Sequence, residues 1–359
     1  GEVYIGCKIR KKTEAGGKFT FGILPVPENL PKVVFLPKSR RFLLIEEVIR
    51  RYAKSVFSNF DIHSRCIFRV TRNADIPIDE GLFDHDLDFR DIMAKLVKKR
   101  KKLHPVRIEF QGNPDGETVS ILSKVLDVSE NFVFKQKMPL TLGFMPVLEK
   151  YLEKQSELFF KPLTPQLSPA ILRNVSLIDQ IKHKDILLSY PYENINQFIR
   201  LLDEAAENPD VSSIKITLYR VARDSKIINA LNKAAENGKD VLALVELRAR
   251  FDEENNIGWS KQLEDAGVQV IYGLEELKVH SKLLLITLRS GNDVTYITQV
   301  GTGNYNERTS KLYTDLTLLT ADKAIGADAS VVFNALCEET TVESTNRLLV
   351  APKGLKSRI

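Results

Sequence analysis

The chain has 359 residues, more than one ordinary domain contains, and this length predicts two domains and part of a third. Its 52 lysines and arginines against 47 acidic residues give a formal charge of +5, too small an excess for a nucleic-acid-binding tail, so we expect no nucleic-acid partner. No apolar run reaches about 18 residues, the start shows no signal-peptide pattern, and Cys7, Cys66 and Cys337 suit neither a disulfide framework nor a zinc site. We therefore expect a cytoplasmic protein, with peripheral attachment to a membrane left open.

The first part of the chain alternates strand-like and helix-like segments. The pattern predicts strands at residues 33–37 and 67–71 and a helix at residues 43–56. Residues 86–102 predict a further helix that ends in the basic run 98–102. We interpret this run as a solvated helix end stabilised by the helix dipole, and a polyanion contact is the alternative. This part predicts an α/β or α+β unit.

Prolines interrupt the periodicity between residues 136 and 175, and they predict a domain boundary near residue 163. Beyond it, helices are predicted at residues 195–207, 225–236 and 254–266, and strands at 213–220, 241–246, 268–272, 277–288 and 294–300. This succession predicts a central sheet flanked by helices. A last helix at 323–336 leads into strand-like residues 347–350, where a third domain can start.

A histidine and a lysine stand together in the strand predicted at residues 277–288. Because side chains alternate along a strand, Lys282 is expected to project on the same side as His280. A neutral imidazole nitrogen can attack phosphorus, and an ammonium group can hold an anionic oxygen. The alternative for a lone histidine beside an apolar strand is a structural residue with satisfied hydrogen bonds.

A glycine-bearing turn follows the next predicted strand, in Gln299-Val-Gly-Thr-Gly-Asn-Tyr-Asn306. Glycines let backbone N–H groups approach a phosphate closely, and Asn304 can hydrogen-bond an imidazole or a phosphate oxygen. A tight strand exit is the alternative. His-x-Lys followed by a strand and Gly-x-Gly-Asn resembles the half-site of the phospholipase D superfamily. Thr287 stands where that superfamily has an aspartate, which disfavours a phosphodiesterase.

Two arginine-bearing segments precede the histidine, Thr217-Leu-Tyr-Arg-Val-Ala-Arg-Asp-Ser225 and Val245-Glu-Leu-Arg-Ala-Arg-Phe-Asp-Glu-Glu254. Both lie where predicted strands end, which is where open α/β sheets bind ligands. Arg220 and Arg250 can present planar guanidinium groups to phosphate oxygens. Surface ion pairs with Asp224 or Asp252 are the alternative.

Four segments together resemble the polyphosphate kinase family. They are the two arginine segments, the Lys-Val-His-Ser-Lys segment, and the glycine turn with its continuation to Asp315. Phe68-Arg-Val-Thr-Arg-Asn-Ala-Asp75 resembles the signature of that family's head domain, so the resemblance extends over nearly the whole chain. It implies a multi-domain α/β fold. We expect a head domain at residues 1–163, a first phospholipase-D-like catalytic domain at 164–322 and the beginning of a second at 323–359.

The resemblance implies that the enzyme is an ATP:polyphosphate phosphotransferase. The terminal phosphate of ATP passes reversibly to polyphosphate through a phosphohistidine at His280, and Lys282 and Asn304 are further catalytic residues. The partners are then ATP, ADP and polyphosphate, and the family associates into homo-oligomers, either dimers or tetramers.

The resemblance also implies the nucleotide site. Tyr313 matches the tyrosine that contacts the adenine, and a core tyrosine on a strand is the alternative. Arg220 and Arg250 match arginines at the family's magnesium and phosphate site, with Mg²⁺ as cofactor. Because a guanidinium group cannot ligate a cation, we interpret both as phosphate clamps beside Mg²⁺.

The family's second catalytic domain supplies a second histidine and an arginine, and no recognisable motif for either follows Phe333. We therefore expect poor or no turnover from these 359 residues alone. Two alternatives stay open. One is a phospholipase-D-like phosphodiesterase that pairs two half-sites across a dimer. The other is a non-catalytic polyanion-binding module that uses Arg220, Arg250, Lys282 and the 98–102 run.

Overall fold

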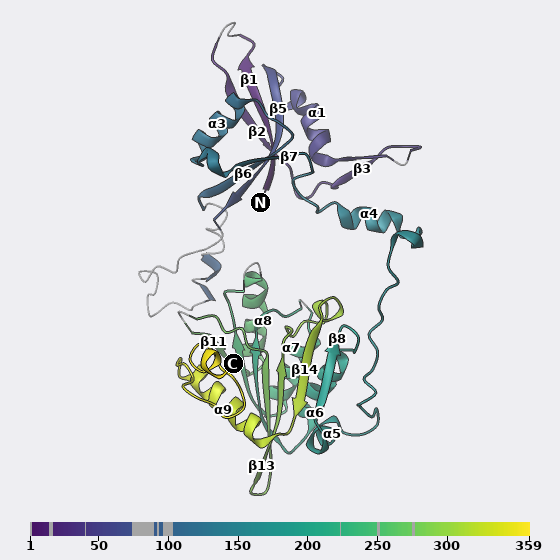
Figure 1. Ribbon diagram of the computed structural model, residues 1–359, viewed down its shortest axis with the longest axis vertical. Helices are drawn as coiled ribbons and strands as arrows, with labels where there is room; N and C mark the ends of the chain where they lie inside the picture. Colours follow the sequence, from purple (N-terminus) through teal and green to yellow (C-terminus); the bar gives the residue numbers. More distant parts are fainter. Residues whose placement is uncertain are drawn as a thin grey trace. The chain divides into compact units, whose positions relative to one another are not determined.

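The computed structural model describes residues 2–13, 17–39, 41–73, 90–91, 93–95, 103–222, 224–249, 252–274 and 277–359. The chain divides into two compact units, one from residues 1–82 and 98–161 and the other from residues 83–97 and 162–359 (Figure 1). The basic run predicted at residues 98–102 lies outside the described residues. Within the described ranges, no helix combines the length and apolar character needed to cross a membrane.

The first unit is built on a five-stranded sheet in the order β2-β1-β5-β6-β7. Its strands are β1 (Glu2–Lys11), β2 (Thr20–Pro25), β5 (Phe60–Arg72), β6 (Pro105–Gln111) and β7 (Val133–Gln136). Neighbouring strands are antiparallel except β6 and β7, which are parallel. A separate hairpin pairs β3 (Val33–Phe35) with β4 (Phe42–Leu44), and the helices are α1 (Ile45–Val56), α3 (Gly116–Leu126) and α4 (Met145–Leu152), with single turns η2 (Glu130–Phe132) and η3 (Ser156–Leu158).

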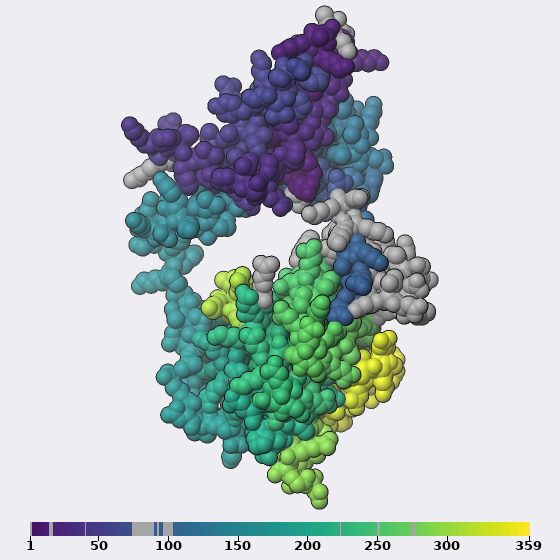
Figure 2. Space-filling model, turned by 180° about the vertical axis from the view of Figure 1, so that it is seen from behind, coloured from purple at the N-terminus to yellow at the C-terminus, as the bar shows by residue number. Residues whose placement is uncertain are grey.

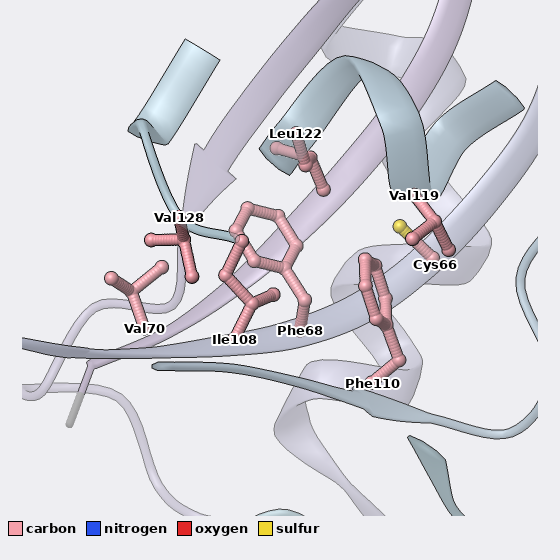
Figure 3. Close-up of a cluster of buried hydrophobic side chains, with 8 residues drawn as sticks. All are labelled: Cys66, Phe68, Val70, Ile108, Phe110, Val119, Leu122 and Val128. Carbon is pink, nitrogen blue, oxygen red and sulfur yellow. The ribbon is translucent and has the colours of Figure 1, made fainter. Parts of the chain in front are cut away.

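Alternation along β5 gives this sheet two apolar faces. One face packs against α3 in a cluster of Cys66, Phe68, Val70, Ile108, Phe110, Val119, Leu122 and Val128 (Figure 3). On the other face, Ile67 packs with Ile5 of β1 and Ala53 of α1. Helix α3 begins where the Asp115 carboxylate accepts the N–H of Thr118 at 2.9 Å, as an N-cap does. The first unit therefore has a helix on each side of its sheet.

The second unit is built on a seven-stranded sheet in the order β11-β10-β9-β12-β13-β14-β8. Its strands are β8 (Ile186–Tyr190), β9 (Val211–Leu218), β10 (Asp240–Val245), β11 (Gln269–Tyr272), β12 (Leu283–Ser290), β13 (Asp293–Gly301) and β14 (Asp315–Thr320). Strands β9, β10 and β11 are parallel, and the other neighbouring pairs are antiparallel. The helices are α5 (Leu177–His183), α6 (Asn196–Glu207), α7 (Lys226–Glu236), α8 (Glu253–Asp265), α9 (Lys323–Cys337) and α10 (Leu355–Arg358), with the turn η4 (Thr309–Lys311).

Helices cover both faces of this sheet, as the sequence predicts for an α/β protein. Helix α6 precedes β9, α7 connects β9 to β10, and α8 connects β10 to β11. In the view from behind, these helices lie in the teal to green surface of the unit (Figure 2). Helix α9 packs on the opposite face, where Ala329 and Phe333 contact the side chains of Leu242, Leu283 and Leu285. The expected α/β fold with a central sheet is confirmed.

Two predicted strands are wrong in part or in whole. The strand predicted at residues 277–288 begins only at Leu283, so His280 lies in an irregular segment before β12. Residues 347–350 form no strand, because backbone N–H groups of Arg347 and Leu348 bond to the buried carboxylate of Asp328 instead of to a neighbouring strand.

Candidate active site

One edge of the seven-stranded sheet collects segments from five strands. Strands β9 and β10 are parallel and end there, β12 is antiparallel to β9 and starts there, β13 ends there and β14 starts there. The turn between β12 and β13 lies at the opposite end, at the bottom of Figure 1. The sheet topology therefore brings Arg220, His280, Lys282 and Asn304 to a single edge. The sequence predicts strand ends for the arginine and glycine segments, whereas it predicts His280 and Lys282 within a strand.

The segment that carries His280 is held on both sides by buried side chains. On one side, the Glu246 carboxylate accepts the N–H of Val279 at 2.9 Å. On the other, the Thr217 hydroxyl donates to the carbonyl of Ser281 at 2.9 Å and accepts the N–H of Leu283 at 3.1 Å. Glu246 and Thr217 are both about 2% exposed, so neither bond competes with bulk water. The backbone on both sides of His280 is fixed by hydrogen bonds other than a strand ladder.

A second buried network supports the same segment. The Arg248 side chain donates to the carbonyls of Leu274 and Leu277 at 2.6 and 2.5 Å, and its backbone N–H donates to Glu246 at 2.9 Å. The Asn256 side chain donates to the carbonyls of Tyr219 and Glu246 at 2.9 Å each. Arg248, which follows β10, therefore orients the chain that precedes His280, and Asn256 of α8 holds the residues that directly follow β9 and β10. Sequence reasoning missed these roles, because Glu246, Arg248 and Asn256 resemble ordinary polar residues after a strand or on a helix.

The ring of Tyr219 contacts three of the predicted site residues, namely His280, Lys282 and Arg220. Its centroid lies 4.8 Å from that of the His280 ring, with an interplanar angle of 80°. The Lys282 Nζ atom lies 5.2 Å from the Tyr219 centroid and the Arg220 Cζ atom lies 5.6 Å from it, both within cation–π range. Tyr219 follows β9 directly and was missed as a site residue, although it stands beside Arg220 in the motif.

The same surroundings lower the pKa values of the histidine and the lysine. Desolvation, followed by the positive charges of Lys282 and Arg220, lowers the pKa of His280 below 6.5. The imidazole is therefore mostly neutral, and nucleophilic, at pH 7. Burial lowers the pKa of Lys282 to about 8, against the opposing charge of Asp315. The Lys282 ammonium group also donates to the backbone carbonyl of His280, so the lysine head group lies beside the backbone of the histidine in a segment that is not a strand.

The glycine turn after β13 packs tightly against β14. A Cβ atom at Gly303 would lie 2.5 Å from Oδ2 of Asp315, so this position needs glycine for a close approach. The Thr302 hydroxyl donates to Asp315 at 2.8 Å and accepts the N–H of Leu316 at 3.0 Å. Among the described residues, the buried Oδ1 atom of Asn304 has no hydrogen-bond donor. Asn304 therefore retains a side-chain acceptor for a ligand or for an imidazole N–H.

The rest of that motif has structural contacts. Tyr305 is buried and stacks on Phe198 with ring centroids 5.1 Å apart. The Glu307 carboxylate accepts from the Ser225 hydroxyl at 2.8 Å and from the N–H of Lys226 at 2.7 Å, where α7 begins. These contacts fix the turn to the helical layer of the sheet.

The remaining predicted residues have different surroundings. Arg220 pairs with Asp252 at 2.8 Å, which is the ion pair expected as the alternative to phosphate binding. Arg250 lies outside the described residues. Tyr313 lies in the turn between η4 and β14 with 62% of its surface exposed, so the alternative of a core tyrosine on a strand is wrong.

Thr287, which stands where the phospholipase D half-site has an aspartate, lies within β12 opposite Ser213 and Tyr296. It lines a cavity of about 460 Å³ on the face of the sheet, whereas His280 lines a separate cavity of about 450 Å³ beside α9 and residues 340–352. Position 287 and the histidine therefore do not share a cavity.

In the part of the chain that the structure describes, no group of three or more histidine, cysteine, aspartate or glutamate residues is placed to hold a metal ion. The cationic groups of Arg220 and Lys282 cannot ligate a cation. The described residues do not form a cage for Mg²⁺.

Comparison with known proteins gives two family matches. Residues 1–148 match the middle domain of polyphosphate kinase, and residues 176–342 match the C-terminal domain 1 of polyphosphate kinase. These matches cover most of each structural unit.

Individual relatives agree with the family matches. The chain is 40% identical over 350 residues to a polyphosphate kinase of Halalkalibacterium halodurans, covering 95% of this chain and 49% of that protein. It is 38% identical over 340 residues to a polyphosphate kinase of Lactiplantibacillus plantarum, covering 94% and 47%. The crystal structure of polyphosphate kinase from Porphyromonas gingivalis matches with a TM-score of 0.74 and 29% identity, over 99% of this chain and 52% of that one. The chain spans about half the length of the relatives it matches.

Proposed function

Because the chain belongs to the polyphosphate kinase family, we propose that its second unit carries the histidine that takes a phosphoryl group from ATP and passes it to polyphosphate. The observation that carries this proposal is the setting of His280. Its backbone is held by Glu246 and Thr217, and its ring contacts Tyr219 beside the cations of Lys282 and Arg220. An exposed imidazole with a lowered pKa beside two cations suits a nucleophile for an anionic phosphoryl group.

The proposed reaction has two balanced steps. A nitrogen of neutral His280 attacks the terminal phosphorus of ATP, so that an N–P bond forms, the P–O bond to ADP breaks, and ADP leaves with the electron pair. A terminal oxygen of polyphosphate then attacks the same phosphorus, the N–P bond breaks, and the chain grows by one phosphate. The transfer is reversible, because the phosphoanhydride bond that breaks in ATP is of the same type as the one that forms in polyphosphate. The imidazole is restored at the end, so His280 acts as a covalent catalyst.

The cationic side chains have distinct roles in this proposal. Lys282 holds charge against the phosphoryl oxygens, and its bond to the His280 carbonyl keeps its ammonium group beside the backbone of the histidine. Arg220 and Arg250 bind phosphate oxygens, with Asp252 orienting the Arg220 guanidinium group. Asn304 contributes its side-chain acceptor to the imidazole or its amide donors to phosphate.

The nucleotide and its metal complete the proposal. Tyr313 is exposed and can stack on the adenine. We propose that Mg²⁺ arrives with the ATP phosphates, because this ion is usually held by substrate phosphates and waters together with few protein ligands.

We also propose a head domain at residues 1–163, a first catalytic domain at 164–322 and the beginning of a second at 323–359. We propose that the protein is cytoplasmic and forms a dimer or a tetramer. Its proposed partners are ATP, ADP and polyphosphate, without nucleic acid.

The two-step scheme is tested by isotope exchange between labelled ADP and ATP in the absence of polyphosphate. A phosphohistidine intermediate requires such exchange, whereas direct transfer between two bound substrates does not. Exchange needs only the first step, so we expect slow exchange above background by the chain, even though the full reaction is expected to turn over poorly or not at all. His280→Gln, whose amide keeps polarity without a nucleophilic nitrogen, should show background exchange. Exchange that persists in His280→Gln would overturn the assignment. Hydrolysis of bis(p-nitrophenyl) phosphate without exchange would favour the phosphodiesterase instead.

A further inference from the structure

The first unit contains a polar cavity of about 420 Å³ that is lined from α1, from β5, and from the residues that follow β6 and β7. Its charged lining consists of Arg50, Arg65, Lys137 and Glu47, three cations against one carboxylate. All of these residues belong to the first unit, so the cavity is distinct from the edge that carries His280. Its volume lies in the range of small-molecule pockets.

Arg65 brings a buried, unpartnered N–H group to the lining of this cavity. The residue lies in β5 opposite Cys7 of β1, and its Nε atom is buried without a hydrogen-bond partner among the described residues. A buried donor of a charged group that is left without an acceptor destabilises the fold. Buried N–H groups normally have partners, so this charged donor is available to a ligand acceptor. The same lining holds one neutral acceptor, Gln111 Oε1, that also lacks a partner among the described residues.

The single carboxylate of the cavity already has partners. Arg50 donates to Glu47 Oε2 at 2.8 Å, and the Gln111 side chain donates to Glu47 Oε1 at 3.0 Å. The negative charge of Glu47 is therefore engaged by α1 and β6 instead of by Arg65. The lining keeps a formal excess of two positive charges. Such an excess around a buried guanidinium donor favours an anion.

We propose that this cavity binds an oligophosphate, a ligand with two or more linked phosphoryl groups. Guanidinium groups match phosphate oxygens in geometry, and a lysine adds a point charge. Cations from three separate elements surround one cavity, which suits several anionic groups in a row better than a single carboxylate. The proposed site is additional to the proposed function. Its lining residues all belong to the first unit, whereas His280 belongs to the second.

The test is calorimetric titration of the intact chain with tripolyphosphate, orthophosphate, sulfate and ATP. We expect Arg65→Gln and Lys137→Gln to weaken tripolyphosphate binding at least tenfold at one class of site. The matched controls are Arg51→Gln, next to Arg50 on α1, and Lys135→Gln, on β7; both side chains are exposed and outside the cavity lining, so binding is expected to stay unchanged. ADP–ATP exchange at His280 should persist in all four variants, which separates this site from the active site.

Each outcome decides the proposal. If the cavity variants lose affinity for tripolyphosphate and for ATP to a comparable extent, the site is supported and accepts both free and nucleotide-linked phosphates. If they lose affinity for only one of the two, the site is supported and that compound represents its ligand. Equal affinity for sulfate and tripolyphosphate, or unchanged binding in both cavity variants, overturns it. Thermal unfolding checks folding; if Arg65→Gln unfolds, Arg65→Lys and the exposed Lys137→Gln carry the same test.

Discussion

The hydroxyl of Thr217 donates to the carbonyl of Ser281 at 2.9 Å and so ties the end of β9 to the residue that follows His280. On the other side of the histidine, Glu246 accepts the N–H of Val279. A nucleophile on an irregular segment is thereby given a fixed backbone, which positions its ring without a strand.

Thr217→Val should therefore separate shape from hydrogen bonding. Valine keeps the β-branched shape but leaves the N–H of Leu283 and the carbonyl of Ser281 without this partner, so we expect a loss of about 1–3 kcal/mol in the free energy of unfolding. ADP–ATP exchange should fall as the histidine segment loosens. Thr217→Ser keeps the hydroxyl and is the control. Denaturant unfolding and exchange rates measure both effects, and equal behaviour of the two variants would contradict the proposed hold on His280.

Tyr219 is expected to act through its ring and not through its hydroxyl. Its ring contacts His280, Lys282 and Arg220, so Tyr219→Phe should keep most of the exchange rate. Tyr219→Leu removes the aromatic face, and a loss of about 0.5–1 kcal/mol for each cation contact predicts a several-fold lower rate. Steady-state exchange at saturating nucleotide gives the comparison. A Phe variant as slow as the Leu variant would show that the hydroxyl matters instead.

The pH dependence follows from the two lowered pKa values. His280 must be neutral to attack, and its pKa is lowered by burial and by the charges of Lys282 and Arg220, so the rate should rise with pH at a midpoint below 6.5. Lys282 must be charged, and its pKa of about 8 predicts that the rate falls again near pH 8. Lys282→Arg should remove the fall at high pH, because arginine stays protonated.

A direct NMR titration of the His280 ring checks the first pKa without the titration of ATP itself. A midpoint at or above 6.5 would contradict this account.

Tyr313→Ala tests the proposed adenine contact. The side chain is 62% exposed, so its removal should leave the unfolding free energy nearly unchanged. Loss of stacking worth about 1–3 kcal/mol should raise the apparent KM for ATP by roughly 5-fold to 150-fold. Leu312→Ala, at the neighbouring residue with 77% exposure, is the matched control. If both variants change the KM for ATP equally, Tyr313 has no special contact with the nucleotide.

Periodicity predicted the architecture of the second unit well. Helices α6, α7 and α9 and the parallel strands came from apolar patterns and glycine stops, because burial on a sheet face imposes those patterns. The segment before β12 was predicted as strand because apolar residues continue from it into Leu283. Its backbone bonds to Glu246 and Thr217, and a one-dimensional pattern cannot show bonds to distant side chains.

The residues of the candidate site were likewise predicted only in part. His280, Lys282 and Arg220 were found because their residue types suit phosphoryl chemistry in a recognisable order. Tyr219 and Glu246 were missed, because their contribution depends on burial and contact, which appear only when β9, β10 and the histidine segment meet. The need for glycine at position 303 was interpreted as backbone access to phosphate, whereas the structure gives packing against Asp315 as a sufficient cause.

The central claim is tested most directly by locating the phosphoryl group after brief reaction of the chain with ATP. Peptide mapping by mass spectrometry under neutral conditions preserves the acid-labile N–P bond. We predict a single phosphate on His280, lost when ADP is added and absent from His280→Gln. Phosphate on the neighbouring Ser281, phosphate that survives acid, or an unmodified His280 peptide would contradict the account.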